Sequence, residues 1–244
     1  MKLQVFSDFH LETRDISYPK PLCDILILAG DMCSFDKVDS LQPFLMYVNM
    51  NWKKIIWVLG NHEYYSHSED MSSISDYLKL NISMFPNIVI LDRNIITIDD
   101  YIIMGCTLWS YVSENTEYLC KSAFKKLRVN GKSITREQYN ELHYRDKNWL
   151  LENYNPDKNT IIITHFPTQQ EFTGDPKYNN DSKEIKDVYA NCIDLTTNKK
   201  LLCISGHTHY NFFKIKDNII YKSNQYGNQP EPINFFNRYG LMEL

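Results

Sequence analysis

Polar residues that suit metal binding and acid–base chemistry stand directly after several apolar segments of this 244-residue chain. The stretch Gly60–Tyr65 (GNHEYY) follows the apolar run Lys54–Leu59, which has the pattern of a buried strand in a parallel sheet. In open α/β sheets, ligands collect at the carboxyl ends of such strands. Four other segments end in the same way. Together the strand ends supply Asp8, His10, Asp31, Asn61, His62, His165, His207 and His209.

Each of these residues has an ordinary structural explanation when it is taken alone. An aspartate after a strand usually caps a helix or forms a turn, and a single histidine is usually a surface or core residue. However, five of the seven histidines fall at strand ends, whereas chance would have scattered them over helices and loops. His67 and His143 lie outside this pattern, and we expect them to be structural.

The types of these side chains indicate two metal ions. Carboxylate, amide and imidazole groups without cysteine suit Mn²⁺, Fe²⁺/Fe³⁺ or Zn²⁺ rather than a structural thiolate site. These candidates are too many for one catalytic metal, which typically keeps three protein ligands and an open position. They fit two metals roughly 3.5–4 Å apart, bridged by a carboxylate, and a bridging water would lose a proton near neutral pH.

The charge of such a site favours an anionic substrate. Two dications carry four positive charges, of which two aspartates and a hydroxide would offset three, leaving about one positive charge. The whole protein has a formal net charge of −4, so the attraction would be local. A phosphate ester satisfies such a pocket better than a neutral peptide bond does. The chain has no overall positive charge that would favour binding to polymeric nucleic acid.

The composition is that of a chain that can bury a sizeable core. Hydrophobic residues make up 43% of it, and we expect one domain over residues 1–244, because there is no internal repeat or composition break. The six cysteines lack CxxC spacing, which argues against a zinc knuckle or a disulfide framework. Met1 leads directly into a strand, and no apolar run approaches the roughly 18 residues of a membrane span. We therefore expect a cytoplasmic protein with reduced thiols.

The elements that must position the candidate residues alternate between strands and helices. A capping box at Thr135–Gln138 opens one helix, whereas the weak pattern of 112–131 favours an excursion over the rim of the fold, at about 112–148, rather than core. The short runs 88–91, 95–98 and 101–104 indicate a meander or hairpin. Other predicted elements are strands at 3–7, 24–29, 54–59, 160–164 and 201–205, helices at 38–52, 70–85 and 181–191, and a hairpin of 211–215 with 219–223.

The chain resembles the calcineurin-like metallophosphoesterases in five motifs that come in the family's order. The motifs are Asp8-x-His10, Gly30-Asp31, Gly60-Asn61-His62-Glu63, His165 and Gly206-His207-Thr208-His209. They span residues 8–209, and together they are far more specific than any one of them. The resemblance implies a four-layer α-β-β-α sandwich, in which two facing mixed sheets are flanked by helices and carry the site at their top.

The resemblance also implies a role for each residue. Asn61 and His62 would contact the phosphoryl group, and His62 would protonate the leaving oxygen as a general acid. The bridging hydroxide would attack phosphorus in line. The first metal would be held by Asp8, His10 and His209, the second by Asn61, His165 and His207, and both by Asp31 as the bridge.

Three features leave alternatives open. Ser34 stands where many members of the family have a second aspartate, so a supporting contact is either missing or made by the Ser34 hydroxyl. Tyr64 and Tyr65 either stack on a base or aryl group of the substrate or pack against the rim. A basic set within the excursion either engages phosphates or forms a solvated face. This set consists of Lys121, Lys125, Lys126, Arg128, Lys132 and Arg136.

We therefore expect a phosphoesterase that uses two divalent metal ions, manganese first and iron or zinc as alternatives, on a mono- or diester of a small or nucleotide-like substrate. A nuclease acting on polymeric nucleic acid is one alternative. The net charge of −4 and the lack of an aromatic–basic groove speak against it. A non-catalytic scaffold, like the retromer subunit that resembles these enzymes, predicts lost ligands, above all His62, and here none is lost.

Overall fold

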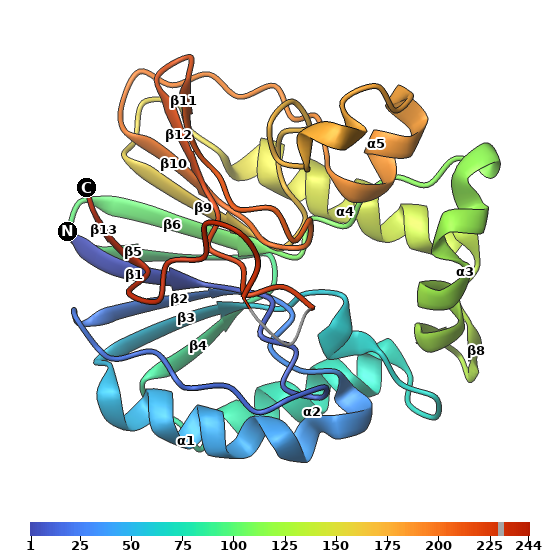
Figure 1. The fold of residues 1–244 in the computed structure, drawn as a ribbon, viewed down its shortest axis with the longest axis horizontal. Coiled ribbons are helices and arrows are strands. Elements are labelled where there is room, and N and C mark those ends of the chain that lie inside the picture. The colour runs from blue at the N-terminus through green and yellow to red at the C-terminus, as the bar shows by residue number, and fades with distance from the viewer. Residues whose placement is uncertain (229–231) are drawn as a thin grey trace.

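A computed structural model describes residues 1–228 and 232–244 of the chain. Two β-sheets face one another at its centre, and helices cover their outer surfaces (Figure 1). The first sheet has the strand order β13-β1-β2-β3-β4, in which β1 to β4 are parallel and β13 is antiparallel at the edge. Its strands are β1 (Lys2–Phe6), β2 (Ile25–Ala29), β3 (Lys54–Val58), β4 (Ile88–Leu91) and β13 (Leu241–Glu243).

The second sheet has the order β11-β12-β10-β9-β6-β5. Its inner strands are parallel, and β5 and β11 are antiparallel edges. The strands are β5 (Asn94–Ile98), β6 (Tyr101–Cys106), β9 (Thr160–Thr164), β10 (Leu201–Ile204), β11 (Phe213–Lys216) and β12 (Ile219–Lys222). Apart from both sheets, β7 (Arg128–Val129) pairs with β8 (Lys132–Ser133).

Helices flank both sheets, so the layers follow the expected α-β-β-α sandwich. The capping box of α4 is formed as predicted, because Thr135 Oγ1 accepts from the Gln138 N–H at 3.3 Å and Gln138 Oε1 accepts from the Thr135 N–H at 3.0 Å. The α-helices are α1 (Gln42–Asn51), α2 (Met71–Ile82), α3 (Glu117–Lys126), α4 (Arg136–Asn153) and α5 (Lys183–Tyr189), with 3₁₀ turns η1 (Phe35–Leu41), η2 (His62–Tyr64), η3 (Glu114–Thr116) and η4 (Pro176–Tyr178).

Successive side chains along the strands point to opposite faces of each sheet, and both faces are buried in apolar clusters. Val5 and Val58 of the first sheet pack in one buried cluster with Ile163 of the second, so this cluster fills the space between the sheets. Their chain neighbours Phe6 and Trp57 point to the opposite face and pack in the cluster that contains residues of α1 and α2. A third cluster joins the outer face of the second sheet to α4.

Two predicted elements differ from the structure in their pairing or shape. The strand at 88–91 is not part of a meander with the next two, because β4 pairs in parallel with β3 while β5 and β6 form a hairpin in the other sheet. The helix predicted at 38–52 is divided into η1 and α1, and Pro43 stands in the first turn of α1, where its fixed φ angle suits a helix start.

The stretch 112–148 contributes to the core, contrary to the expectation from its weak pattern. It contains α3 and most of α4, and Val112, Phe124 and Leu127 are buried in the cluster that covers the first sheet. The buried residues of α3 are Cys120 and Phe124, which lie one helical turn apart and attach this short helix to the core. The other side chains of α3 are mostly polar or charged, so the segment is hydrophilic on average although one face of it is buried.

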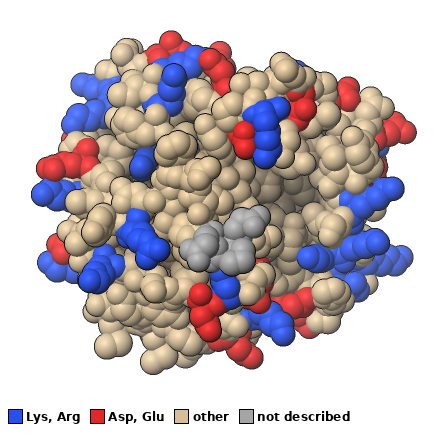
Figure 2. All heavy atoms as spheres, viewed as in Figure 1, with Lys and Arg blue, Asp and Glu red and all other residues tan. Residues whose placement is uncertain are grey.

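The distribution of charged side chains on the surface agrees with the modest net charge. On the face drawn in Figure 2, basic and acidic side chains are interspersed around the periphery, and uncharged residues fill most of its middle. Among the described residues, no helix combines the length and the apolar character that crossing a membrane requires.

Candidate metal centre

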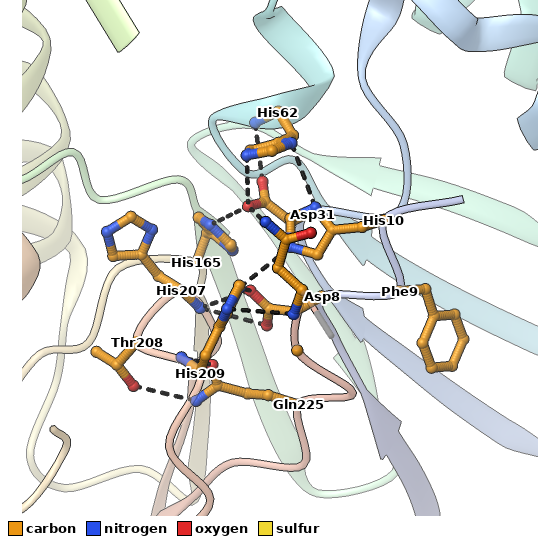
Figure 3. Close-up of polar contacts among 12 residues, drawn as sticks. Asp8, Phe9, His10, Asp31, His62, His165, His207, Thr208, His209 and Gln225 are labelled. Atoms are coloured by element: carbon orange, nitrogen blue, oxygen red, sulfur yellow. Dashed lines mark hydrogen bonds and ion pairs between the residues drawn. The ribbon is translucent and has the colours of Figure 1, made fainter. Parts of the chain in front are cut away.

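The carboxyl ends of β1, β2, β3, β9 and β10 meet at one end of the two sheets and bring the candidate side chains together (Figure 3). The backbone turns sharply at these ends. The φ angles there lie in the left-handed region, which costs residues other than glycine conformational energy and is found mostly at functional sites. They are 57° at Asp8, 48° at His10, 57° at Asp31, 71° at His207 and 50° at His209.

Glycines in two of the motifs make room for the aspartates. A Cβ at position 60 would lie 2.2 Å from Asp31 Oδ1, and a Cβ at position 206 would lie 2.6 Å from Asp8 Oδ2. Both separations are far below van der Waals contact, so a larger residue at either position would displace a carboxylate. Gly60 and Gly206 are therefore explained by the close approach of the strand ends.

The first group of ligand atoms consists of Asp8, His10 and His209. His209 Nε2 lies 3.4 Å from Asp8 Oδ1 and 3.1 Å from His10 Nε2. Asp8 and His10 are buried. The His207 N–H donates to Asp8 Oδ1 at 3.1 Å, which fixes the carboxylate toward the centre.

The second group consists of Asn61, His165 and His207. The amide oxygen of Asn61 lies 3.0 Å from His165 Nε2 and 3.1 Å from His207 Nδ1. The other ring nitrogen of His165 lies 2.9 Å from the carbonyl oxygen of Ala29, to which it can donate. In the neutral ring this bond places the proton on Nδ1 and leaves Nε2, which is directed at the centre, as the atom that could bind a metal.

Asp31 stands between the two groups. Its Oδ2 atom lies 3.3 Å from His165 Nε2 and 3.9 Å from both His10 Nε2 and His62 Nε2. Burial raises the pKa of Asp31, but the charges that His165, His62 and His10 can carry, with the hydrogen bond from His165, together outweigh it, and the pKa lies well below its usual range. Burial lowers the pKa of His165, but the charge and hydrogen bond of Asp31, the charge of Asp8 and the hydrogen bond to the Ala29 carbonyl together offset this and raise it to about 9.

Glu63 holds the two strand ends that carry Asp31 and Asn61. Its carboxylate accepts from the backbone N–H groups of Asp31 at 2.9 Å, Met32 at 2.6 Å and Gly60 at 2.6 Å. Burial, and then the charge of Asp31, raise the pKa of Glu63 to about 7. Cations bound next to Asp31 would remove that repulsion, and the three donors would then favour the ionised carboxylate.

His62 lies beside Asp31 and is oriented by Glu12. His62 Nδ1 is 2.8 Å from Glu12 Oε1, and the same oxygen is 3.2 Å from His10 Nδ1. Burial lowers the pKa of His62, but the charges of Asp31 and Glu12 and the hydrogen bond to Glu12 raise it overall. Burial raises the pKa of Glu12, but the hydrogen bonds from the two histidines lower it to about 2.

The chemistry of these donors fits divalent metal ions. Three sets of carboxylate and imidazole groups each offer ligand atoms within 4.8 Å of one another: Asp8, His10 and His209; His10, Asp31 and His62; and Asp31, His165 and His207. His10 Nε2 and His209 Nε2 lie 3.1 Å apart, close enough to share one proton as a hydrogen bond or to bind one cation together. Imidazole and carboxylate without thiolate suit Mn²⁺, Fe²⁺ or Zn²⁺.

Three supporting residues were not identified by the sequence reasoning. Glu63 lies within the Gly60–Glu63 motif and Glu12 stands two residues after the Asp8-x-His10 motif, so their spacing to His62 and His10 was the available signal. Gln225 is reached only through the fold: its Oε1 accepts from the His209 N–H at 2.6 Å, and the segment after β12 returns beside β1. Ser34 supports the site through its backbone N–H, which donates to Glu12 Oε2 at 3.2 Å.

The remaining candidates have structural partners. Tyr65 is buried, and its hydroxyl accepts from the Asn61 amide at 2.8 Å, while Tyr64 packs against Trp109, so both tyrosines pack against the rim. His67 is exposed and pairs with Asp36. His143 is buried, and its Nδ1 lies 2.8 Å from the carbonyl oxygen of Trp109. These two histidines lie outside the centre, as expected.

With this geometry in place, the motifs can be compared with known proteins. The model of the calcineurin-like phosphoesterase family matches residues 1–211. The chain belongs to this family. Its members are metal-dependent phosphoesterases, and the resemblance inferred from the five motifs is confirmed. The strand ends that bring the candidate ligands together all lie within the part of the chain that the family model covers.

Two individual proteins resemble this calcineurin-like phosphoesterase over nearly its whole length. An uncharacterised protein, L509, of Acanthamoeba polyphaga mimivirus is 32% identical over 256 residues, covering 97% of this chain and 87% of that protein. The crystal structure of phosphopantetheinyl hydrolase (PptH) from Mycobacterium tuberculosis has a TM-score of 0.65 at 19% identity and covers 93% of this chain and 89% of that one. The second likeness concerns the fold, and it agrees with the two facing mixed sheets described above.

Proposed function

We propose that this family member hydrolyses a phosphate mono- or diester of a small or nucleotide-like organic group with two divalent metal ions. One observation carries the proposal. A single carboxylate oxygen, Asp31 Oδ2, lies within 3.9 Å of imidazole nitrogens that come from the ends of β1, β3 and β9. A shared oxygen of this kind, with nitrogen and oxygen donors on both sides, is what a bridge between two cations needs.

In this proposal, Asp8, His10 and His209 hold one ion, Asn61, His165 and His207 hold the other, and Asp31 contacts both. Manganese is the first choice, with iron or zinc as alternatives, because the donors are oxygen and imidazole nitrogen. When bound, the ions would supply Lewis-acid stabilisation of the phosphoryl oxygens and would lower the pKa of water.

The chain's own contribution is to bind the phosphoryl group and to supply a proton. Asn61 and His62 contact the phosphoryl group, and Glu12 and Asp31 keep the proton on His62, whose pKa is raised. In the hydrolysis, a water molecule releases one proton to solvent, its oxygen forms a new bond to phosphorus, and the bond to the leaving oxygen breaks. His62 donates its proton to that oxygen and later regains one from solvent, so the enzyme returns to its starting state.

The test is a panel of activity assays in which each metal ion is added separately. Protein freed of metal with a chelator is reconstituted with Mn²⁺, Fe²⁺ or Zn²⁺ and assayed on aryl mono- and diesters, cyclic nucleotides and short oligonucleotides. We expect hydrolysis of small esters that depends on added metal and saturates at two equivalents. Preference for oligonucleotides, with binding that falls steeply as salt is added, would favour a nuclease instead. No metal-dependent hydrolysis of any ester would refute the proposal.

A further inference from the structure

A cavity of about 540 Å³ opens directly beside the candidate metal centre. His207 and His209 form one wall of it, and the segment that contains η4 and α5 forms the opposite wall, with one residue of α3. This volume lies in the range of small-molecule sites, which are roughly 300–1,000 Å³. The cavity and the centre are therefore one continuous site, in which the phosphate lies at the metals and the organic part of the ester extends into the cavity.

The wall opposite the two histidines presents apolar and aromatic side chains. Tyr178 and Tyr189 line the cavity together with Leu119 and Ile185. The two tyrosines are 53% and 46% exposed, so their rings are accessible to a ligand. The ring of Tyr189 lies 6.4 Å from that of His207 at an interplanar angle of 31°, a tilted arrangement that places Tyr189 at the junction of the cavity and the centre.

The charges in the cavity argue against a second phosphate group. Asp175 and Asp181 line it together with Lys186, whose ammonium group donates to the carbonyl oxygen of Asn179 at 2.6 Å. Among the described residues that form the lining, none belongs to the basic set of Lys121, Lys125, Lys126, Arg128, Lys132 and Arg136. Because two carboxylates and one ammonium group line the cavity, a polyphosphate or an oligonucleotide strand would meet net negative charge there.

We propose that the substrate is a phosphate ester of a single uncharged aromatic group, which stacks against Tyr189 and Tyr178 in this cavity while its phosphate occupies the metal centre. The inference rests on the proposed function, which it makes more specific. Stacking of a base on an aromatic side chain is worth about a tenfold change in affinity or more. The selectivity comes from α5 and the turn before it rather than from the five metal-binding motifs.

The test uses two phosphonates, which are not hydrolysed and differ in the organic group alone. Phenylphosphonate and methylphosphonate are titrated as competitive inhibitors, or by calorimetry, into the metal-loaded protein. We expect phenylphosphonate to bind at least about tenfold more tightly. Tyr189→Ala and Tyr178→Ala should each reduce that ratio about three- to tenfold, and Tyr189→Phe should preserve it. Tyr144→Ala is the matched control, because Tyr144 is 50% exposed and lies outside the cavity.

The possible results separate the two proposals. A wild-type ratio near one, or a ratio that neither alanine variant changes, would overturn the aromatic site even if the enzyme hydrolyses phosphate esters well. Absence of hydrolysis for every ester and metal would refute the phosphoesterase activity itself. Because the tyrosines are largely exposed, their replacement should leave the fold intact, which circular dichroism of each variant would verify.

Discussion

The contact between Glu12 and the two histidines gives a prediction about stability that can be worked from the structure. In metal-free protein, replacement of Glu12 by glutamine removes the charge that His10 and His62 contact at 3.2 and 2.8 Å. The side chain of Glu12 is 9% exposed, so solvent screens these contacts little. The pKa of Glu12 falls from its ordinary 4.5 to about 2, because the two hydrogen bonds outweigh the effect of burial.

A pKa that is lowered on folding contributes stability above its unfolded value, and that stability is lost as the pH falls through the folded value. About 2.5 pKa units correspond to about 3 kcal/mol near pH 6, falling by about half by pH 3. The pKa of His62 is raised, so its share of the contact is present below about pH 6.5 and is lost as the pH rises through the folded pKa of His62. The amide of glutamine keeps one acceptor, so we expect a loss of about 2–3 kcal/mol between pH 5 and pH 6.

The measurement is urea unfolding in the presence of EDTA from pH 6 to pH 3, comparing wild type, Glu12→Gln and the control Glu152→Gln, whose side chain is exposed on α4. The difference between wild type and Glu12→Gln should shrink as the pH falls, and the control should differ little from wild type at any pH. A difference that is below about 0.5 kcal/mol at pH 6, or constant with pH, would refute the reasoning.

The same variant has a kinetic consequence in the metal-loaded enzyme. Loss of Glu12 lowers the pKa of His62, so less of it carries the proton at neutral pH. Esters with poor leaving groups need that proton most. Glu12→Gln should therefore slow an alkyl phosphodiester more than a nitrophenyl one, and equal effects on both would argue against His62 as the proton donor.

Three further variants test the centre. His62→Ala should retain both metals and slow hydrolysis of a phosphodiester about 10²- to 10⁴-fold, the usual contribution of a general acid; loss of metal with unchanged turnover per bound metal would contradict the assigned role. Asp31→Asn should weaken both metals together, because the amide loses the charge that faces both groups, and elemental analysis showing two full equivalents would reject it as the bridge. Gly60→Ala should cost about 1–3 kcal/mol in unfolding free energy, because the added methyl would lie 2.2 Å from Asp31 Oδ1. Gly174→Ala, where the methyl would meet no atom within 4 Å, should be near neutral in urea unfolding.

The sequence by itself determined the strands and the residues at their ends. The apolar runs of β1, β2, β3, β9 and β10 are continuous and bounded by turn residues, so their ends can be located from local pattern alone. Parallel strands place their carboxyl ends at one edge of a sheet, and this rule made Asp31 and Asn61, after β2 and β3, candidate neighbours before any contact was known. That His165, after β9 of the second sheet, joins them was decided by the way the two sheets face each other. Family membership followed from the order of those motifs.

Only the tertiary structure decided which strands pair and which groups support the ligands. Nothing local distinguishes β4, which joins the first sheet, from β5, which joins the second a few residues later, because the choice depends on partners distant in sequence. Gln225 reaches His209 for the same reason. Tyr178 and Tyr189 line the cavity beside the centre because α5 and the turn before it pack next to His207. Their side chains carry no motif, and their role comes from where the fold places them.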